Sequence, residues 1–151
     1  MSVCRIIASD IPLDEFAPAQ DYPIEINIDK GIIRDGDADD NYYLKAFSNV
    51  QNYTDKKYGV SLEWRYTDGR ANRIIEYIKS ALLKVESVEF WLVWLMDFYD
   101  FEERPFIHKK TISASELKNE HIKEMDNAMI WNTPDKMYPQ RPSFYCLTIT
   151  R

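Results

Sequence analysis

Between residues 60 and 66 the sequence alternates strictly between apolar and polar positions. In an extended chain the apolar side chains would share one face, made of Val60, Leu62, Trp64 and Tyr66. The opposite face would carry serine, glutamate and arginine. This alternation predicts a β-strand with one buried face.

A helical spacing of apolar residues follows directly after this strand. Alanine, isoleucine and leucine recur between residues 71 and 82, with charged residues between them. Thr67 or Asp68 supplies a side-chain oxygen that can accept a hydrogen bond from a free backbone N–H group of the first turn. We therefore expect an amphipathic helix that ends near Lys84.

Residues 88–97 form the second predicted strand, which is apolar on both faces. A third strand is predicted over residues 106–112. The segment after it has the spacing of a capping box, with Ser113 at the N-cap and Glu116 three residues later. This spacing predicts a second helix that continues to about Met129 or Trp131.

A last strand is predicted over residues 143–150, after a connector with three prolines. From residue 60 onward the predicted order is therefore β-α-β-β-α-β. That order is typical of a ferredoxin-like α+β core, in which two helices pack on one face of a four-stranded antiparallel sheet. Residues 60–151 would form this core. Residues 1–58 would be a β-rich N-terminal extension of the same single domain, because no linker separates the two parts.

The N-terminal extension contains further strand patterns. Residues 3–8 are mostly apolar, and isoleucines alternate with polar residues over residues 24–28. Lys30-Gly31 can turn the chain back into Ile32-Ile33. Residues 40–50 fit either a short helix or an irregular strand.

The strand over residues 88–97 raises the question of what covers its second face. In a two-layer fold that face is often open, yet Trp91, Val93 and Leu95 make it apolar. Leaving such side chains in water would forgo about 1.5–3 kcal/mol each. Three covers are available: the N-terminal extension, a second copy in a homodimer, or a different partner or ligand. We expect the extension, because apolar surface is normally buried within its own chain.

The charge balance narrows the class of function. A formal net charge of −6 argues against nucleic acid, whose phosphates are bound by Lys and Arg, and against an anionic membrane surface. No apolar run approaches the roughly 20 residues of a transmembrane helix, and the apolar opening is too short for a signal peptide. We expect a cytoplasmic protein that carries no cofactor.

One segment combines acidic residues with aromatic rings. Between Val85 and Glu103 there are six carboxylates and no Lys or Arg. Its last part consists of Asp97, Phe98, Tyr99, Asp100, Phe101, Glu102 and Glu103. This part is either a solvated hairpin tip or a docking loop, in which aromatic anchors supply contact area and carboxylates steer a basic partner.

Arg70 and Arg73 lie in the first turn of the first predicted helix. Free backbone N–H groups and two guanidinium groups can bind an anion there, and solvated arginines are the alternative. Residues 35–40, DGDADD, match the first three ligand positions of an EF-hand loop but lack the required glycine and the bidentate glutamate. We therefore expect an acidic turn there.

His108 and His121 are the two histidines of the chain, and Cys4 and Cys146 are its two cysteines. None of them has the spacing of a metal site, so no metal is expected. Two cysteines are too few for a disulfide framework, and we expect both thiols to be reduced.

These observations favour a non-catalytic interaction protein that binds a basic protein partner through the acidic-aromatic segment 97–103. Small antitoxin- or immunity-type inhibitors offer an analogy for such a surface. The alternative is a small-ligand-binding domain or a hydrolytic enzyme that uses carboxylates of this segment with His108, or an anion site at Arg70 and Arg73. An enzyme is the less favoured class, because the sequence contains no recognisable nucleophile motif.

Overall fold

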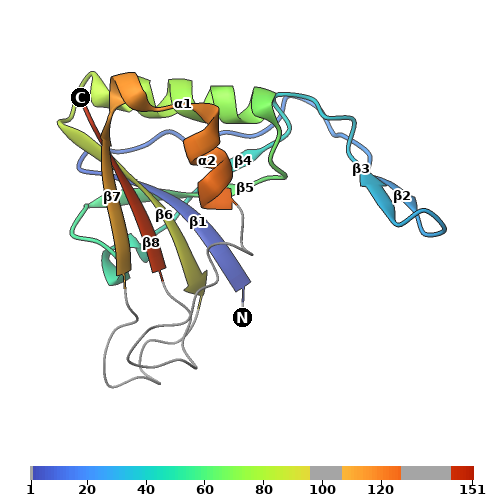
Figure 1. The fold of residues 1–151 in the computed structure, drawn as a ribbon, viewed down its shortest axis with the longest axis horizontal. Helices are drawn as coiled ribbons and strands as arrows, with labels where there is room; N and C mark the ends of the chain where they lie inside the picture. The colour runs from blue at the N-terminus through green and yellow to red at the C-terminus, as the bar shows by residue number, and fades with distance from the viewer. Residues whose placement is uncertain (1, 96–106, 127–143) are drawn as a thin grey trace.

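The computed structural model describes residues 2–95, 107–126 and 144–151, and its centre is a six-stranded sheet (Figure 1). In order across the sheet, the strands are β4 (Tyr43–Ala46), β5 (Tyr58–Glu63), β1 (Ser2–Ser9), β6 (Ser87–Leu95), β8 (Phe144–Thr150) and β7 (Ile107–Ser113). Neighbouring strands are antiparallel, except that β7 and β8 are parallel. The described residues thus form a mixed α+β fold.

Helix α1 (Asp68–Leu82) and helix α2 (Asn119–Asp126) lie on one face of the sheet (Figure 1). The Thr67 side chain accepts a hydrogen bond of 3.1 Å from the backbone N–H of Arg70, which confirms the predicted N-cap of α1. The capping box at Ser113 and Glu116 is also present, but it begins the short 3-10 helix η3 (Ala114–Glu116) and not α2 itself.

The predicted ferredoxin-like topology is not confirmed, because the strand order differs and the sheet is mixed. Strand β1 lies between β5 and β6, so the N-terminal segment supplies a central strand. Strand β8 lies between β6 and β7, so these two do not form a hairpin. The physical reason is that Ile6, Ile7 and Ala8 of β1 are apolar on both faces, and both faces are fully buried only inside a sheet.

Strand β6 is buried on both faces from Phe90 to Val93, as its apolar run predicts. Val88, Phe90 and Leu92 pack toward the helices. Trp91 and Val93 belong to a second apolar cluster on the opposite face. A strand of this kind needs a cover on each side, and the second cover is provided by the N-terminal half of the chain.

The segment between β1 and β5 contains two further features. The hairpin of β2 (Glu25–Asn27) and β3 (Ile32–Arg34) projects away from the sheet, and we call it the arm (Figure 1). Residues 40–50 contain β4, so the strand alternative holds for part of this stretch, and the 3-10 helix η1 (Val50–Asn52) begins only at its last residue. No helix in the described ranges is long and apolar enough to cross a membrane.

Candidate functional site

The sheet face opposite the helices, here called the far face, is covered by residues 47–53. Val50 and Tyr53 are buried against Trp91 and Val93, which are 2% and 0% exposed. The first of the three expected covers, the N-terminal segment, is therefore the one present on this face. The side chain of Leu95 lies outside the described residues.

Small residues make room for this cover. Gly59 of β5 pairs with Ala8 of β1, and both residues lie beneath η1. A Cβ atom on Gly59 would lie only 2.7 Å from Cγ2 of Val50. Val50 therefore sits where a side chain at position 59 would otherwise project, which fixes η1 against the far face.

Arg70, one half of the expected anion site, is completely buried. Its guanidinium donates to the backbone oxygens of Ala38 and Arg65, each at 2.9 Å, and to Oδ2 of Asp35, also at 2.9 Å. Arg73 is exposed on the surface of α1. The structure does not bring the two arginines into one site, because Arg70 is engaged by acceptors of the chain itself.

The acidic turn of residues 35–40 supplies the carboxylates at this end of α1. Asp35 and Asp37 both accept hydrogen bonds from the guanidinium of Arg65. The carboxylate of Asp39 lies so close to Gly69 that a Cβ atom there would collide with it. The turn therefore anchors the arm to the start of the helix, and the described residues contain no group of three or more metal-ligating side chains.

The hydrogen bond from Arg70 is the main reason that the pKa of Asp35 falls from its ordinary 3.8 to about 2. The second arginine, Arg65, lowers the pKa further, while partial burial opposes both effects. Asp35 is therefore ionised throughout the physiological range. Its charge is used to neutralise buried Arg70 and is not free to bind a cation or act as an acid.

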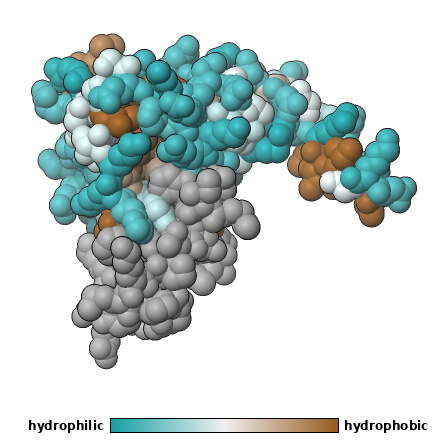
Figure 2. Space-filling view, in the orientation of Figure 1, coloured by the Kyte–Doolittle hydropathy of each residue, from teal (hydrophilic) through white to brown (hydrophobic). Residues whose placement is uncertain are grey.

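Among the large apolar side chains described in the N-terminal half, those of the arm have the highest exposed fractions. Ile24, Ile26, Ile28 and Ile33 are 64%, 67%, 88% and 65% exposed. Ile26 pairs with Ile33 across the hairpin, so these two share a face. Ile24 directly precedes β2, and Ile28 directly follows it at the start of the turn. Figure 2 shows the resulting apolar patch on the arm, set apart from the body of the molecule.

The arm lies in a strongly acidic part of the chain. Residues 10–40 contain ten carboxylates and only two cations, Lys30 and Arg34. This surplus exceeds the net charge of −6 of the whole chain, so the remaining residues are slightly positive. An apolar face within an acidic segment is a surface that suits a basic partner.

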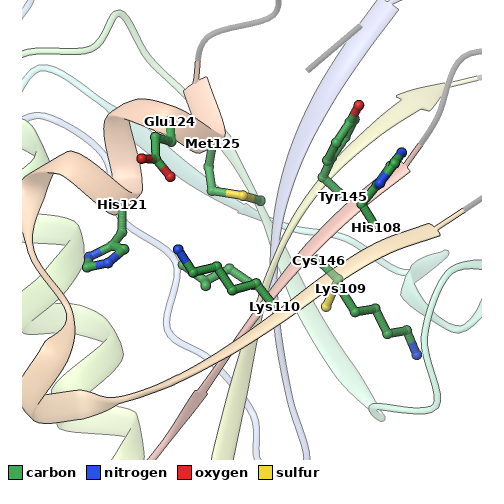
Figure 3. Close-up of a pocket in the computed structure, with 9 residues that line it drawn as sticks. His108, Lys109, Lys110, His121, Glu124, Met125, Tyr145 and Cys146 are labelled. Atoms are coloured by element: carbon green, nitrogen blue, oxygen red, sulfur yellow. The ribbon is translucent and has the colours of Figure 1, made fainter. Parts of the chain in front are cut away.

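A separate cavity of about 210 Å³ lies between α2 and strands β7 and β8 (Figure 3). Met125 and Leu147 contribute apolar walls, and Tyr145 stacks on His108 with ring centroids 4.6 Å apart. His121 lies at the α2 side, where its Nδ1 accepts a hydrogen bond of 3.0 Å from the backbone N–H of Lys118. The two histidines are thus brought to one cavity, although they are remote in sequence.

Both cysteines are free and both point to the far face of the sheet. They do not pair, because β6 lies between β1, which carries Cys4, and β8, which carries Cys146. Burial raises the pKa of Cys4 to about 11 and that of Cys146 to about 12. Neither thiol is therefore a nucleophile at neutral pH.

The acidic-aromatic segment 97–103 lies outside the described residues, and its role stays a prediction. The strands that flank it, β6 and β7, are not neighbours in the sheet, so the expected two-stranded hairpin around it is not formed. Comparison of the chain with protein-family models, with curated proteins and with solved structures finds no match.

The sequence predicted the strands of the arm but not its exposure. The alternation over residues 24–28 indicates a strand with one apolar face, and such a face is normally buried. Two features instead indicate that this apolar face is exposed. The arm strands are only three residues each, and the nearest chain segments are acidic turns. A two-stranded hairpin of this size has no second layer of its own to cover its isoleucines.

Proposed function

We propose that this protein is a non-catalytic interaction protein that binds a basic protein partner. The observation that carries the proposal is the group of exposed isoleucines on the arm, residues 24, 26, 28 and 33. Exposed apolar groups gathered on one projecting element are typical of a binding surface. Burying each of these side chains on a partner would contribute about 1.5–3 kcal/mol before the costs of association.

The sign of the partner's charge follows from the distribution of carboxylates. The arm and its flanks, residues 10–40, carry eight more carboxylates than cations. Carboxylates around an apolar contact speed association with a basic protein and oppose association with an acidic one. The acidic-aromatic segment 97–103 has the same chemistry, and we propose it as a second contact surface for the same partner.

The experiment that tests this function is an affinity capture from the native cell lysate at low salt, read by mass spectrometry. Four baits are compared: the wild type, the arm variant I26S/I28S, the segment variant D100K/E102K/E103K, and L83S. Leu83 is 81% exposed at the end of α1, remote from the arm in sequence, so L83S is a matched control for loss of an exposed apolar side chain.

The expected result is a basic protein retained by the wild type and by L83S and reduced or lost with one or both of the other variants. Retention should also fall as salt is raised to about 0.5 M, where charges are screened beyond a few ångström. Equal capture by all four baits, or no capture by any, would contradict the proposal.

The cavity beside α2 supports a second candidate, a small-ligand-binding domain. Its specific observation is that His108 and His121 both line one cavity of about 210 Å³, from opposite sides. A ligand at 100 times its Kd would stabilise the folded state by about 2.7 kcal/mol and raise the Tm. A thermal-shift screen of small metabolites with the wild type and H121A tests this candidate function. If no metabolite raises the Tm of the wild type more than that of H121A, the cavity is not a ligand-binding site.

A further inference from the structure

The arm meets the edge of the six-stranded sheet at a groove of about 350 Å³. Ile24 and Ile33 form the arm side of this groove. Tyr43 of β4 and Trp64, which follows β5, form the sheet side, and Glu63 and Arg65 line its rim. We call this site the elbow groove. Every one of these residues lies in a described range.

We propose that the elbow groove is the docking site for an extended segment of the partner in which apolar residues alternate with lysine or arginine. This inference rests on the proposed function and specifies where and what the protein binds. In an extended segment, successive side chains point to opposite sides. The apolar side chains of the partner would enter the groove, and its basic side chains would face the acidic surroundings.

The apolar walls of the groove are accessible. Ile24 and Ile33 are 64% and 65% exposed, and Tyr43 is 38% exposed. Strand β4 is the edge strand of the sheet. On its outer side, the described chain forms a single isolated β-bridge, between Phe16 and Leu44. The groove is therefore bounded by structure on two sides and open to an incoming segment.

The sheet side of the groove is held in a fixed arrangement. The indole N–H of Trp64 donates a 3.0 Å hydrogen bond to Oδ1 of Asp126, the last described residue of α2, and Asp126 also pairs with Arg5 of β1. The ring of Trp64 packs edge-to-face on Tyr66, with centroids 5.7 Å apart. A wall that is already ordered loses little conformational entropy on binding.

Lys45 of the same chain shows that the rim of the groove can bind a cation. Nζ of Lys45 lies 2.9 Å from the carboxylate of Glu63 and 5.2 Å from the centroid of the Tyr43 ring. A carboxylate and an aromatic face together form a suitable environment for an ammonium or guanidinium group. Lys45 contacts Oε2 of Glu63, whose side chain is 56% exposed, so a cation of the partner can reach the same carboxylate beside Lys45.

A second copy of this chain is a poorer occupant. In a dimer, each copy would bring its own acidic turn, residues 35–40, and the rest of its acidic residues 10–40 toward the groove of the other copy. Like charges brought together oppose association. The charge around the groove therefore favours a basic segment over self-association.

The test uses defined peptides as probes and ¹H–¹⁵N correlation spectra of the labelled protein. The first peptide alternates valine and lysine over ten residues. Two matched peptides replace every lysine with glutamate or every valine with serine. The protein variants are I24S/I33S, which removes the arm side of the groove, and L83S as the exposed apolar control.

The valine–lysine peptide is expected to shift the amide signals of Ile24, Ile33 and Tyr43 and the indole signal of Trp64. I24S/I33S and the serine–lysine peptide should each weaken binding about tenfold or more, since each loses apolar burial, and L83S should not. Binding of the valine–glutamate peptide with equal affinity, shifts confined to another surface, or unchanged affinity of I24S/I33S would overturn the proposal. So would a wild-type dimer in sedimentation that I24S/I33S converts to a monomer, because the occupant would then be a second copy.

The outcomes separate this inference from the proposed function. If I24S/I33S, used as a bait in the lysate experiment, captures the same basic partner as the wild type, the function stands and the elbow groove is not its site. If no bait captures a basic protein, the proposed function itself fails, whatever the peptides do.

Discussion

At the scale of single residues, buried Arg70 shows how one charge determines the state of its surroundings. A guanidinium without a partner inside a protein is costly, because water no longer solvates it. Here two backbone carbonyls and Asp35 solvate it instead. The sequence suggests Arg70 as an anion-binding group, and the anion that it binds is the carboxylate of Asp35 in the same chain.

At pH 7 the free energy of unfolding of the Asp35→Asn variant is expected to be about 2 kcal/mol lower than that of the wild type. This difference corresponds to the lowered pKa of Asp35. The folded pKa of about 2 lies below the ordinary 3.8. The contribution of ionised Asp35 is therefore fully present above pH 3.8 and is lost as the pH falls toward 2.

Urea unfolding followed by circular dichroism at pH 7 and at pH 2.5 measures this difference. The gap between wild type and variant should narrow at the lower pH. Asp29→Asn, at an exposed carboxylate of the arm, is the control and should leave stability at both pH values nearly unchanged. A gap that stays constant across the two pH values would show that Asp35 does not act through its charge.

The two thiols provide a second prediction at this scale. Because burial holds the pKa of Cys4 near 11 and that of Cys146 near 12, few thiolates are present at pH 8. Both cysteines should react slowly with a disulfide reagent such as dithionitrobenzoate in the folded protein and rapidly in concentrated urea. A fast reaction of Cys146 in the folded protein would mean that the far face opens.

At the scale of elements, the short segment 47–53 determines which surfaces of the sheet are available. It covers Trp91 and Val93, so these two side chains of β6 are buried within the chain itself. Packing of this kind is sensitive to the volume of the residues beneath it. Gly59 and Val50 form the closest such contact.

Gly59→Ala is expected to destabilise the protein by about 1–3 kcal/mol, because the added methyl group meets Val50 Cγ2 at 2.7 Å. The same change in a Val50→Ala background should cost clearly less, since the space is then free. Equilibrium unfolding of the two single variants and the double variant measures this coupling. If the effects of the two changes simply add, then Val50 does not pack on Gly59 and η1 does not cover the far face as described.

At the scale of the whole molecule, charge and apolar surface are distributed unevenly. The body contains the helices and the six-stranded sheet. The arm and its flanks carry exposed isoleucines and an excess of carboxylates over cations. On the proposed function, the residues of the arm contact a partner and do not hold the fold together. The proposed function therefore predicts that binding and stability can be separated.

Replacing residues 24–33 by a short Gly-Ser turn tests this separation. The free energy of unfolding should change by less than about 1 kcal/mol, because the strands of the arm are almost entirely exposed. Asp35 remains to pair with Arg70. A loss of cooperative unfolding in urea would show that the arm belongs to the core. Retention of the native spectrum together with loss of partner capture is the expected result.

By itself, the sequence determined most of the local structure. Alternation predicted β5, the helical spacing and Thr67 predicted α1, and the two-faced apolar run predicted that β6 is buried on both sides. These features depend on residues close together in the chain. The apolar residues 3–8 predicted a strand at β1, but the order of predicted elements assigned it to the N-terminal extension and not to the centre of the sheet.

Only the tertiary structure decided the strand order, the cover of the far face and the exposure of the arm. Strand order depends on which distant segments pair, and several pairings satisfy the same local patterns. Arg70 and Asp35 are 35 positions apart, so their ion pair cannot be read from spacing. The isoleucines of the arm satisfy the pattern of a buried strand face, and they remain exposed because no second layer of the described chain reaches them.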